Sequence, residues 1–121
     1  MFINGEWLYA ADQETRPIIN PANKEVIAEV TRASVEETRN AIDAARNAFD
    51  SGIWSDLPAS EKASYLFEIA DKLEENAAEL SALEMSNVGK PLREAEFDVA
   101  DAVACFRYYG DLVTKPSDQT Y

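Results

Sequence analysis

The sequence predicts an incomplete α/β fold in which short β-strands are followed by about four helices. Residues from about 2 to 30 show the turn signals and alternation typical of strands. Residues from about 34 to 114 place apolar side chains every three or four positions, as amphipathic helices do. So few short strands cannot form a sheet that covers all these helices. We therefore expect residues 1–121 to be one segment of a larger domain.

The expected strands alternate with turns. The Asn-Gly pair at positions 4–5 separates residues 2–3 from residues 6–8, and both turn residues accept the positive φ that a two-residue hairpin requires. Further strands are expected over 16–20 and 25–30, on either side of a proline-containing turn.

The expected helices begin at residue 34. Ser34 and Glu37 have the spacing of a capping box, and an apolar stripe follows them. The last helix is expected over about 92–113. The expected boundaries between the helices are Gly52, Pro58, Asn76 and Gly89-Lys90-Pro91.

The composition indicates which classes of binding partner the chain disfavours. Apolar residues make up 46% of the chain, and 23 acidic against 11 basic residues give a formal charge of −12. An acidic surface repels nucleic acid and anionic lipid, so neither is expected as a partner. The chain has one cysteine, no basic-then-apolar leader and no apolar run of about 18 residues, so the expected location is the cytoplasm.

No residue pattern completes a catalytic or phosphate-binding motif. Cys105 lies within an apolar helical stripe of a chain without histidine, so we expect a buried, unreactive thiol. Gly89-Lys90 lacks the other residues of a P-loop, and no dinucleotide-binding glycine pattern occurs. Of the neighbouring rings Tyr108 and Tyr109, only one is expected in the core, because adjacent helical residues point about 100° apart.

The sequence contains three close carboxylate pairs, Glu74/Glu75, Glu94/Glu96 and Asp98/Asp101. Asp98 and Asp101 lie three positions apart, so they share one face of the last helix. Two interpretations stay open, a solvated helix face and a pair of acids at a site.

Five phrases occur in order along the chain. They are Phe2-Ile3-Asn4-Gly5-Glu6-Trp7, Ile19-Asn20-Pro21-Ala22-Asn23, the stretch 44–54, Gly89-Lys90-Pro91-Leu92-Arg93-Glu94-Ala95-Glu96 and Phe106-Arg107-Tyr108-Tyr109. In this order they resemble the N-terminal part of the NAD(P)-dependent aldehyde dehydrogenases, most closely the betaine-aldehyde-like members. The resemblance implies that residues 1–121 are the N-terminal segment of the cofactor-binding domain, without the catalytic and oligomerisation parts.

The resemblance implies an activity for the complete parent protein. Members of this family oxidise an aldehyde to a carboxylic acid with NAD or NADP through a cysteine thioester, and they form homo-oligomers. The implied partners are the remainder of the same polypeptide and a small aldehyde such as betaine aldehyde. Because no catalytic or cofactor-binding residue is implied within 1–121, the segment alone is expected to be inactive and to bind no cofactor.

The resemblance also implies two sites within residues 1–121, one for a monovalent cation and one at the entrance for the aldehyde. A potassium or sodium ion would be held by the backbone carbonyls of Ile18 and Ile19 and by Asn87, which replaces the family's carboxylate and so weakens the site. Asp98 and Asp101 lie on the helix that resembles the lining of the aldehyde entrance, where acids would attract a cationic substrate. The alternative function is a free-standing acidic helical module that binds a partner and has no enzyme activity.

Overall fold

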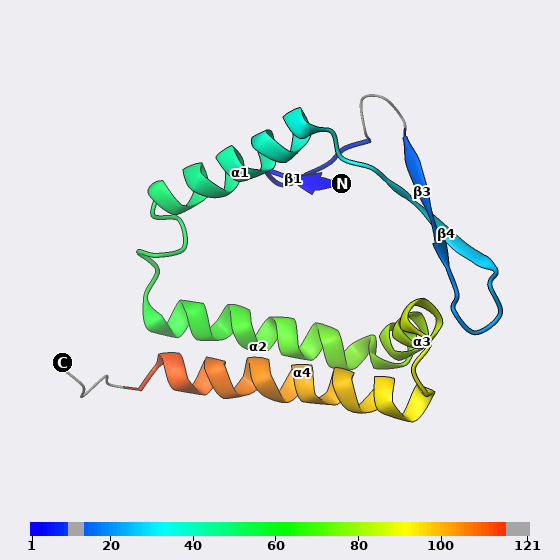
Figure 1. The fold of residues 1–121 in the computed structure, drawn as a ribbon. Helices are drawn as coiled ribbons and strands as arrows, with labels where there is room; N and C mark the ends of the chain where they lie inside the picture. The colour runs from blue at the N-terminus through cyan, green and yellow to red at the C-terminus, as the bar shows by residue number, and fades with distance from the viewer. Residues whose placement is uncertain (10–13, 116–121) are drawn as a thin grey trace, which may run out of the picture. The chain divides into compact units, whose positions relative to one another are not determined.

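The computed structural model describes residues 1–9 and 14–115, which form two compact units, Met1–Asp56 and Leu57–Tyr121. The elements are β1 (Phe2–Ile3), β2 (Glu6–Trp7), β3 (Thr15–Ile19), β4 (Val26–Thr31), α1 (Val35–Asp50), α2 (Ala59–Glu75), α3 (Ala77–Val88) and α4 (Leu92–Val113) (Figure 1). Short strands followed by four helices confirm the predicted fold class. Among the described residues, no helix is long and apolar enough to cross a lipid bilayer.

Two antiparallel hairpins open the first unit. β1 pairs with β2 around Asn4 and Gly5, whose φ angles of 53° and 83° are those that the Asn-Gly turn predicts. β3 pairs with β4 in a register from Thr15↔Thr31 to Ile19↔Val26, with an irregularity between Ile18 and Ile19. No residue of either hairpin is buried within the unit, although a few residues are partly covered.

Helix α1 begins and ends as the sequence predicts. The Ser34 hydroxyl accepts the backbone N–H of Glu37, and the Glu37 carboxylate accepts the backbone N–H of Ser34, which completes the capping box. The helix stops before Gly52, which has a φ of 72°. Alanines of α1 and the β1–β2 hairpin together line a hollow. No residue of α1 is buried. The apolar stripe of α1 remains exposed at Val35, Ile42 and Phe49.

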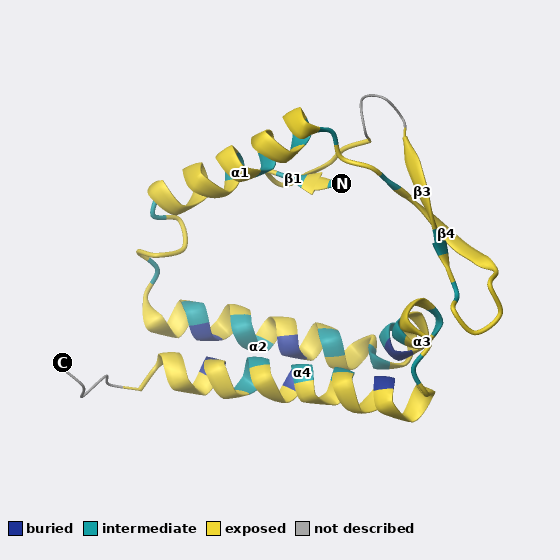
Figure 2. Ribbon diagram, viewed as in Figure 1, coloured by how far each residue is buried: buried dark blue, intermediate teal, exposed yellow. Residues whose placement is uncertain are grey.

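The second unit is built on the packing of α2 against α4, which run side by side in opposite directions (Figure 1). The buried residues on these two helices are small or branched: Ala63, Ala70, Ala95, Val103 and Gly110 (Figure 2). Small side chains let the helix backbones approach closely, and the ring of Phe67 lies directly over Gly110. The short helix α3 contributes a buried Ser81, whose hydroxyl donates to the carbonyl of Ala77.

The ends of these helices follow the predicted signals. Pro58 and Pro91 precede the first residues of α2 and α4, and Asn76 separates α2 from α3. Gly89 ends α3 in the left-handed conformation with a φ of 79°, and its N–H donates to the Met85 carbonyl at 2.9 Å.

Two expectations about burial on α4 are wrong for this chain. Cys105 is exposed, because the buried face of α4 is centred on Val103 and Gly110, and a residue two positions from Val103 points about 200° away from it. Tyr108 and Tyr109 are both exposed, and their rings contact each other edge to face with centroids 5.3 Å apart. Neither ring joins the core of this unit, because both lie off the face that meets α2.

Candidate functional site

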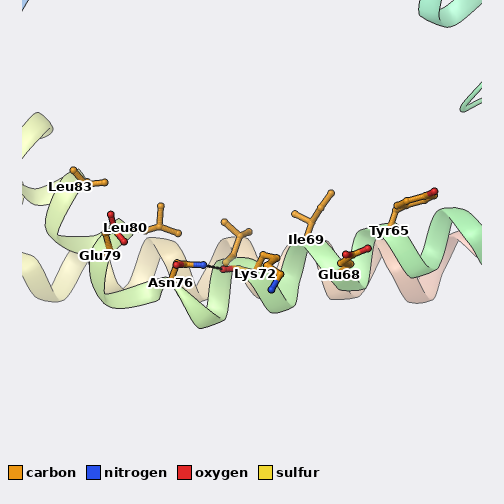
Figure 3. Close-up of a pocket in the computed structure, with 9 residues that line it drawn as sticks. Tyr65, Glu68, Ile69, Lys72, Asn76, Glu79, Leu80 and Leu83 are labelled. Carbon is orange, nitrogen blue, oxygen red and sulfur yellow. Dashed lines mark hydrogen bonds between the residues drawn. The ribbon is translucent and has the colours of Figure 1, made fainter. Parts of the chain in front are cut away.

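One apolar recess in the second unit is a groove along α2 and α3, which we call the α2–α3 groove. It encloses about 520 Å³. Its lining residues are Tyr65, Glu68, Ile69, Lys72, Leu73, Asn76, Glu79, Leu80 and Leu83. Figure 3 shows the side chains of Tyr65, Ile69, Leu80 and Leu83 standing on one side of the helices, with a hydrogen bond from the Asn76 amide to the Lys72 carbonyl below them. The groove offers contact surface and no arrangement of groups for catalysis.

A lysine joins the end of α3 to the start of α4. The Lys90 ammonium binds the Asp98 carboxylate and lies 3.4 Å from a carboxylate oxygen of Glu84. The hydrogen bond to Asp98 is the largest cause of a Lys90 pKa above its ordinary value of 10.5. Desolvation is the second-largest effect and opposes it, whereas the charge of Asp98 and the contact with Glu84 add to the rise. Lys90 therefore stays charged at neutral pH and offsets the charge of Asp98.

An arginine joins α4 to α2 in the same way. The Arg107 guanidinium donates to Glu74 at 2.6 Å and to Asp71 at 3.2 Å. These hydrogen bonds raise the pKa of Arg107 above its ordinary value, with the bond to Glu74 the larger cause. Arg107 also lines a second hollow with Tyr108 and the acids Glu74, Glu96 and Asp111. The arrangement fixes the relation of α2 to α4 and leaves the hollow acidic.

The two acids predicted at a substrate entrance, Asp98 and Asp101, have different surroundings in the structure. Both lie on the exposed side of α4. Asp98 is paired with Lys90, whereas Asp101 lies one turn further along the same helix. The two carboxylates therefore share a face, as predicted, but only Asp98 has its charge offset by a bound lysine among the described ion pairs.

The residues predicted to hold a monovalent cation fall into different units. Ile18 and Ile19 lie at the irregularity of β3, and Asn87 lies exposed in the last turn of α3. Their backbone and amide oxygens are of the type that hard cations prefer. The two isoleucine carbonyls are adjacent in the first unit, and Asn87 belongs to the second. In the described part of the chain, no three His, Cys, Asp or Glu residues gather as a metal site.

Sequence reasoning missed the ion pairs of Lys90 and Arg107 and the α2–α3 groove. In the sequence, Lys90 belongs to a helix stop, an incomplete P-loop pattern and a family phrase, and Arg107 belongs to a family phrase, none of which indicates an ion pair. The partners of Arg107 lie 33 and 36 positions away, so no local spacing indicates them. The groove had a partial signal, since Ile69 and Leu73 belong to the apolar stripe of α2.

The sequence model of the aldehyde dehydrogenase family matches residues 7–121. The chain is 43% identical to aminoaldehyde dehydrogenase 2 of Solanum lycopersicum over 112 residues, which are 93% of this chain and 22% of the relative. It is 41% identical to betaine aldehyde dehydrogenase of Bacillus subtilis strain 168 over 115 residues, which are 95% of this chain and 24% of the relative. The chain thus spans about a quarter of the length of these curated relatives.

Solved structures give the same result at the level of the fold. The betaine aldehyde dehydrogenase of Staphylococcus aureus in complex with NAD+ superposes with a TM-score of 0.92 and 39% sequence identity, over 99% of this chain and 25% of that protein. An apo form of that enzyme carrying a Gly-to-Ser substitution superposes equally well, with a TM-score of 0.92. Because the family match extends over nearly the whole sequence, the chain belongs to the aldehyde dehydrogenase family.

Proposed function

We propose that residues 1–121 are the N-terminal segment of an NAD(P)-dependent aldehyde dehydrogenase that oxidises betaine aldehyde or a related amino aldehyde to the carboxylic acid. The observation that carries this proposal is the 41% identity to a betaine aldehyde dehydrogenase over 95% of the chain. The amino aldehyde dehydrogenases at similar identity support a cationic substrate. The plant relatives include peroxisomal and chloroplastic enzymes, so a cytoplasmic location stays a prediction.

In the proposed reaction, a cysteine thiolate would add to the aldehyde carbon, the hydride on that carbon would leave, and a glutamate-activated water would hydrolyse the thioester that remains. Bound NAD or NADP would accept the hydride. We assign both catalytic groups and the cofactor site to parts of the parent protein outside this sequence. Cys105 supports no nucleophilic role, because the chain contains no histidine to activate it.

The contribution of this segment to substrate binding would be electrostatic. A chain of formal charge −12 attracts cations, and Asp98 and Asp101 on α4 are the acids that we place at the aldehyde entrance. Since Lys90 offsets the charge of Asp98, we expect Asp101 to contribute more of the attraction.

We further propose that the complete protein is a homo-oligomer and that Ile18, Ile19 and Asn87 help to hold a potassium or sodium ion. The support for the ion is limited to the oxygen ligands that these residues offer. An amide at Asn87 in place of a carboxylate predicts weak binding, because the ligand adds no negative charge.

A chimaera tests the proposed function. Residues 7–121 would replace the matching segment of the Bacillus subtilis betaine aldehyde dehydrogenase, and NADH production would be followed with betaine aldehyde. We expect aldehyde oxidation by the chimaera and none by the 121-residue chain alone. A folded but inactive chimaera, or activity of the isolated chain, would contradict the proposal. Stable partner binding by a monomeric isolated chain would instead support the interaction module.

A further inference from the structure

The ammonium of Lys90 is held between an acid of α3 and an acid of α4. It binds the Asp98 carboxylate and lies 3.4 Å from a carboxylate oxygen of Glu84. The side chain of Lys90 is 28% exposed, whereas the paired side chains of Lys72 and Arg107 are 65% and 43% exposed. Because two acids anchor it and little of its side chain is free, Lys90 keeps its charge at a more fixed place than a solvated lysine does.

The chain is restricted on both sides of this lysine. Gly89 ends α3 in the left-handed conformation, and Pro91 precedes α4 with a φ of −58°. A proline ring permits only a narrow range of φ, so the connection between the two helices has little freedom. The fold therefore places the positive charge of Lys90 beside the second turn of α4, where Asp98 lies.

This charge changes the electrostatics of the proposed entrance. Asp98 and Asp101 lie one turn apart on the exposed side of α4, and Asp101 has no ion pair within the described part of the chain. A carboxylate in contact with an ammonium acts as a dipole at longer range, so most of its field is cancelled there. A cation that approaches these two acids thus meets about one net negative charge with Lys90 present and about two without it.

We propose that Lys90 sets how strongly the complete enzyme prefers a cationic aldehyde over an uncharged one, by offsetting the charge of Asp98 at the aldehyde entrance. The inference rests on the proposed function, which places Asp98 and Asp101 at that entrance. Lys90 acts through the charge balance and does not touch the substrate, so it is a positioning residue. Removing its charge strengthens the preference for a cation.

Steady-state kinetics of the chimaera test the proposal. The substrates are betaine aldehyde and its neutral isostere, in which a tert-butyl group replaces the trimethylammonium group, and the readout is the ratio of their KM values. We expect Lys90→Gln to lower KM for betaine aldehyde by roughly twofold and to change KM for the isostere and kcat little. The effect should nearly vanish at about 1 M salt, where charges are screened beyond about 3 Å.

Three further variants separate charge from structure. Lys90→Arg keeps the charge and should keep the wild-type ratio. The double variant Lys90→Gln/Asp98→Asn removes the pair without changing the net charge of the entrance, so the ratio should return to the wild-type value. Lys72→Gln removes the same charge from α2, where Lys72 binds Glu75 at 2.7 Å, and should leave the ratio unchanged.

Nitroxide relaxation tests the charge balance in the 121-residue chain without any activity. Soluble cationic and neutral nitroxides relax nearby amide protons, and the excess caused by the cationic probe reports the local potential. We expect Lys90→Gln to increase that excess around Asp98 and Asp101, and Lys72→Gln to leave it unchanged there. An excess that does not rise in Lys90→Gln overturns the charge balance.

The outcomes separate this inference from the proposed function. A folded but inactive chimaera overturns the proposed function and, with it, the role of Lys90 in specificity. An active chimaera whose KM ratio does not change in Lys90→Gln overturns that role and leaves the proposed function standing. Equal changes for the two aldehydes, or a ratio that Lys90→Arg fails to preserve, make Lys90 a structural residue only and also overturn the proposal.

Discussion

Single residues decide how closely α2 and α4 approach. A Cβ atom built on Gly110 lies 2.9 Å from a ring carbon of Phe67, which is closer than side chains pack. Glycine at this position therefore leaves room for the neighbouring ring, although an α-helix by itself favours alanine. The ion pairs of Lys90 and Arg107 act on the same scale, since each joins two helices through one long side chain.

The Gly110→Ala substitution should destabilise the second unit by about 1 kcal/mol. Alanine improves helix propensity by about 1 kcal/mol, but crowding against Phe67 costs about 1–3 kcal/mol. Urea unfolding of the chain measures the change. The double variant Phe67→Leu/Gly110→Ala should recover part of the loss, and strict additivity of the two changes would show that the ring is not the cause.

The ion pair of Lys90 should make stability depend on alkaline pH. Because the folded pKa is raised above 10.5, the pair stabilises fully below that value, and the contribution is lost as pH rises through the folded pKa. Unfolding free energies of the wild type and Lys90→Gln should therefore differ by a constant amount near neutral pH and converge above about pH 10.5. A difference that stays constant into strong alkali would contradict this assignment.

In the chimaera, Asp101→Asn should raise KM for betaine aldehyde by roughly twofold, because one unit charge acting across about 8 Å of water contributes about 0.5 kcal/mol. The KM for an uncharged aldehyde and the kcat should change little. Asp98→Asn is the matched comparison, and we expect a smaller effect on KM because Lys90 already offsets its charge. Equal effects on charged and uncharged aldehydes would remove Asp101 from the entrance.

At the scale of elements, the local signals at helix ends determine where each helix starts and stops. The capping box of α1, the prolines before α2 and α4, and the left-handed Gly89 all act through neighbours within a few positions. The two hairpins follow the same logic, since the Asn-Gly turn sets the register of β1 and β2. These features explain why the element order could be predicted without any tertiary information.

The Ser34→Ala substitution should weaken the start of α1 by about 1 kcal/mol, because it leaves the backbone N–H of Glu37 without its hydroxyl acceptor. Amide hydrogen exchange in the first turn of α1 should become faster by roughly fivefold, and Ser34→Thr should retain most of the protection. Faster exchange throughout α1 and the second unit alike would indicate global destabilisation and not the loss of a cap.

At the scale of the whole molecule, the chain exposes more apolar surface than its helices can cover. No residue of α1 is buried, and large apolar residues of α2, α3 and α4 remain open to solvent. Such surfaces are typical of contact regions and of incomplete domains. They agree with a segment that spans about a quarter of its relatives.

The isolated chain should show no saturable binding of NAD, whereas the chimaera should bind it. We expect this because the sequence contains no dinucleotide-binding glycine pattern within its 121 residues. Isothermal titration of both proteins under the same conditions measures the difference. Tight, stoichiometric binding by the isolated chain would place a cofactor site within this segment and change the proposed division of the enzyme.

The sequence by itself determined the fold class, the order of the elements and the family, because turns, caps and family phrases consist of residues close together in the chain. Only the tertiary structure decided which side of α4 is buried, and so left Cys105 exposed. It also decided that Lys90 binds Asp98 and that Arg107 binds Asp71 and Glu74. These results depend on how α2, α3 and α4 pack, and packing joins residues whose separation in the sequence carries no local signal.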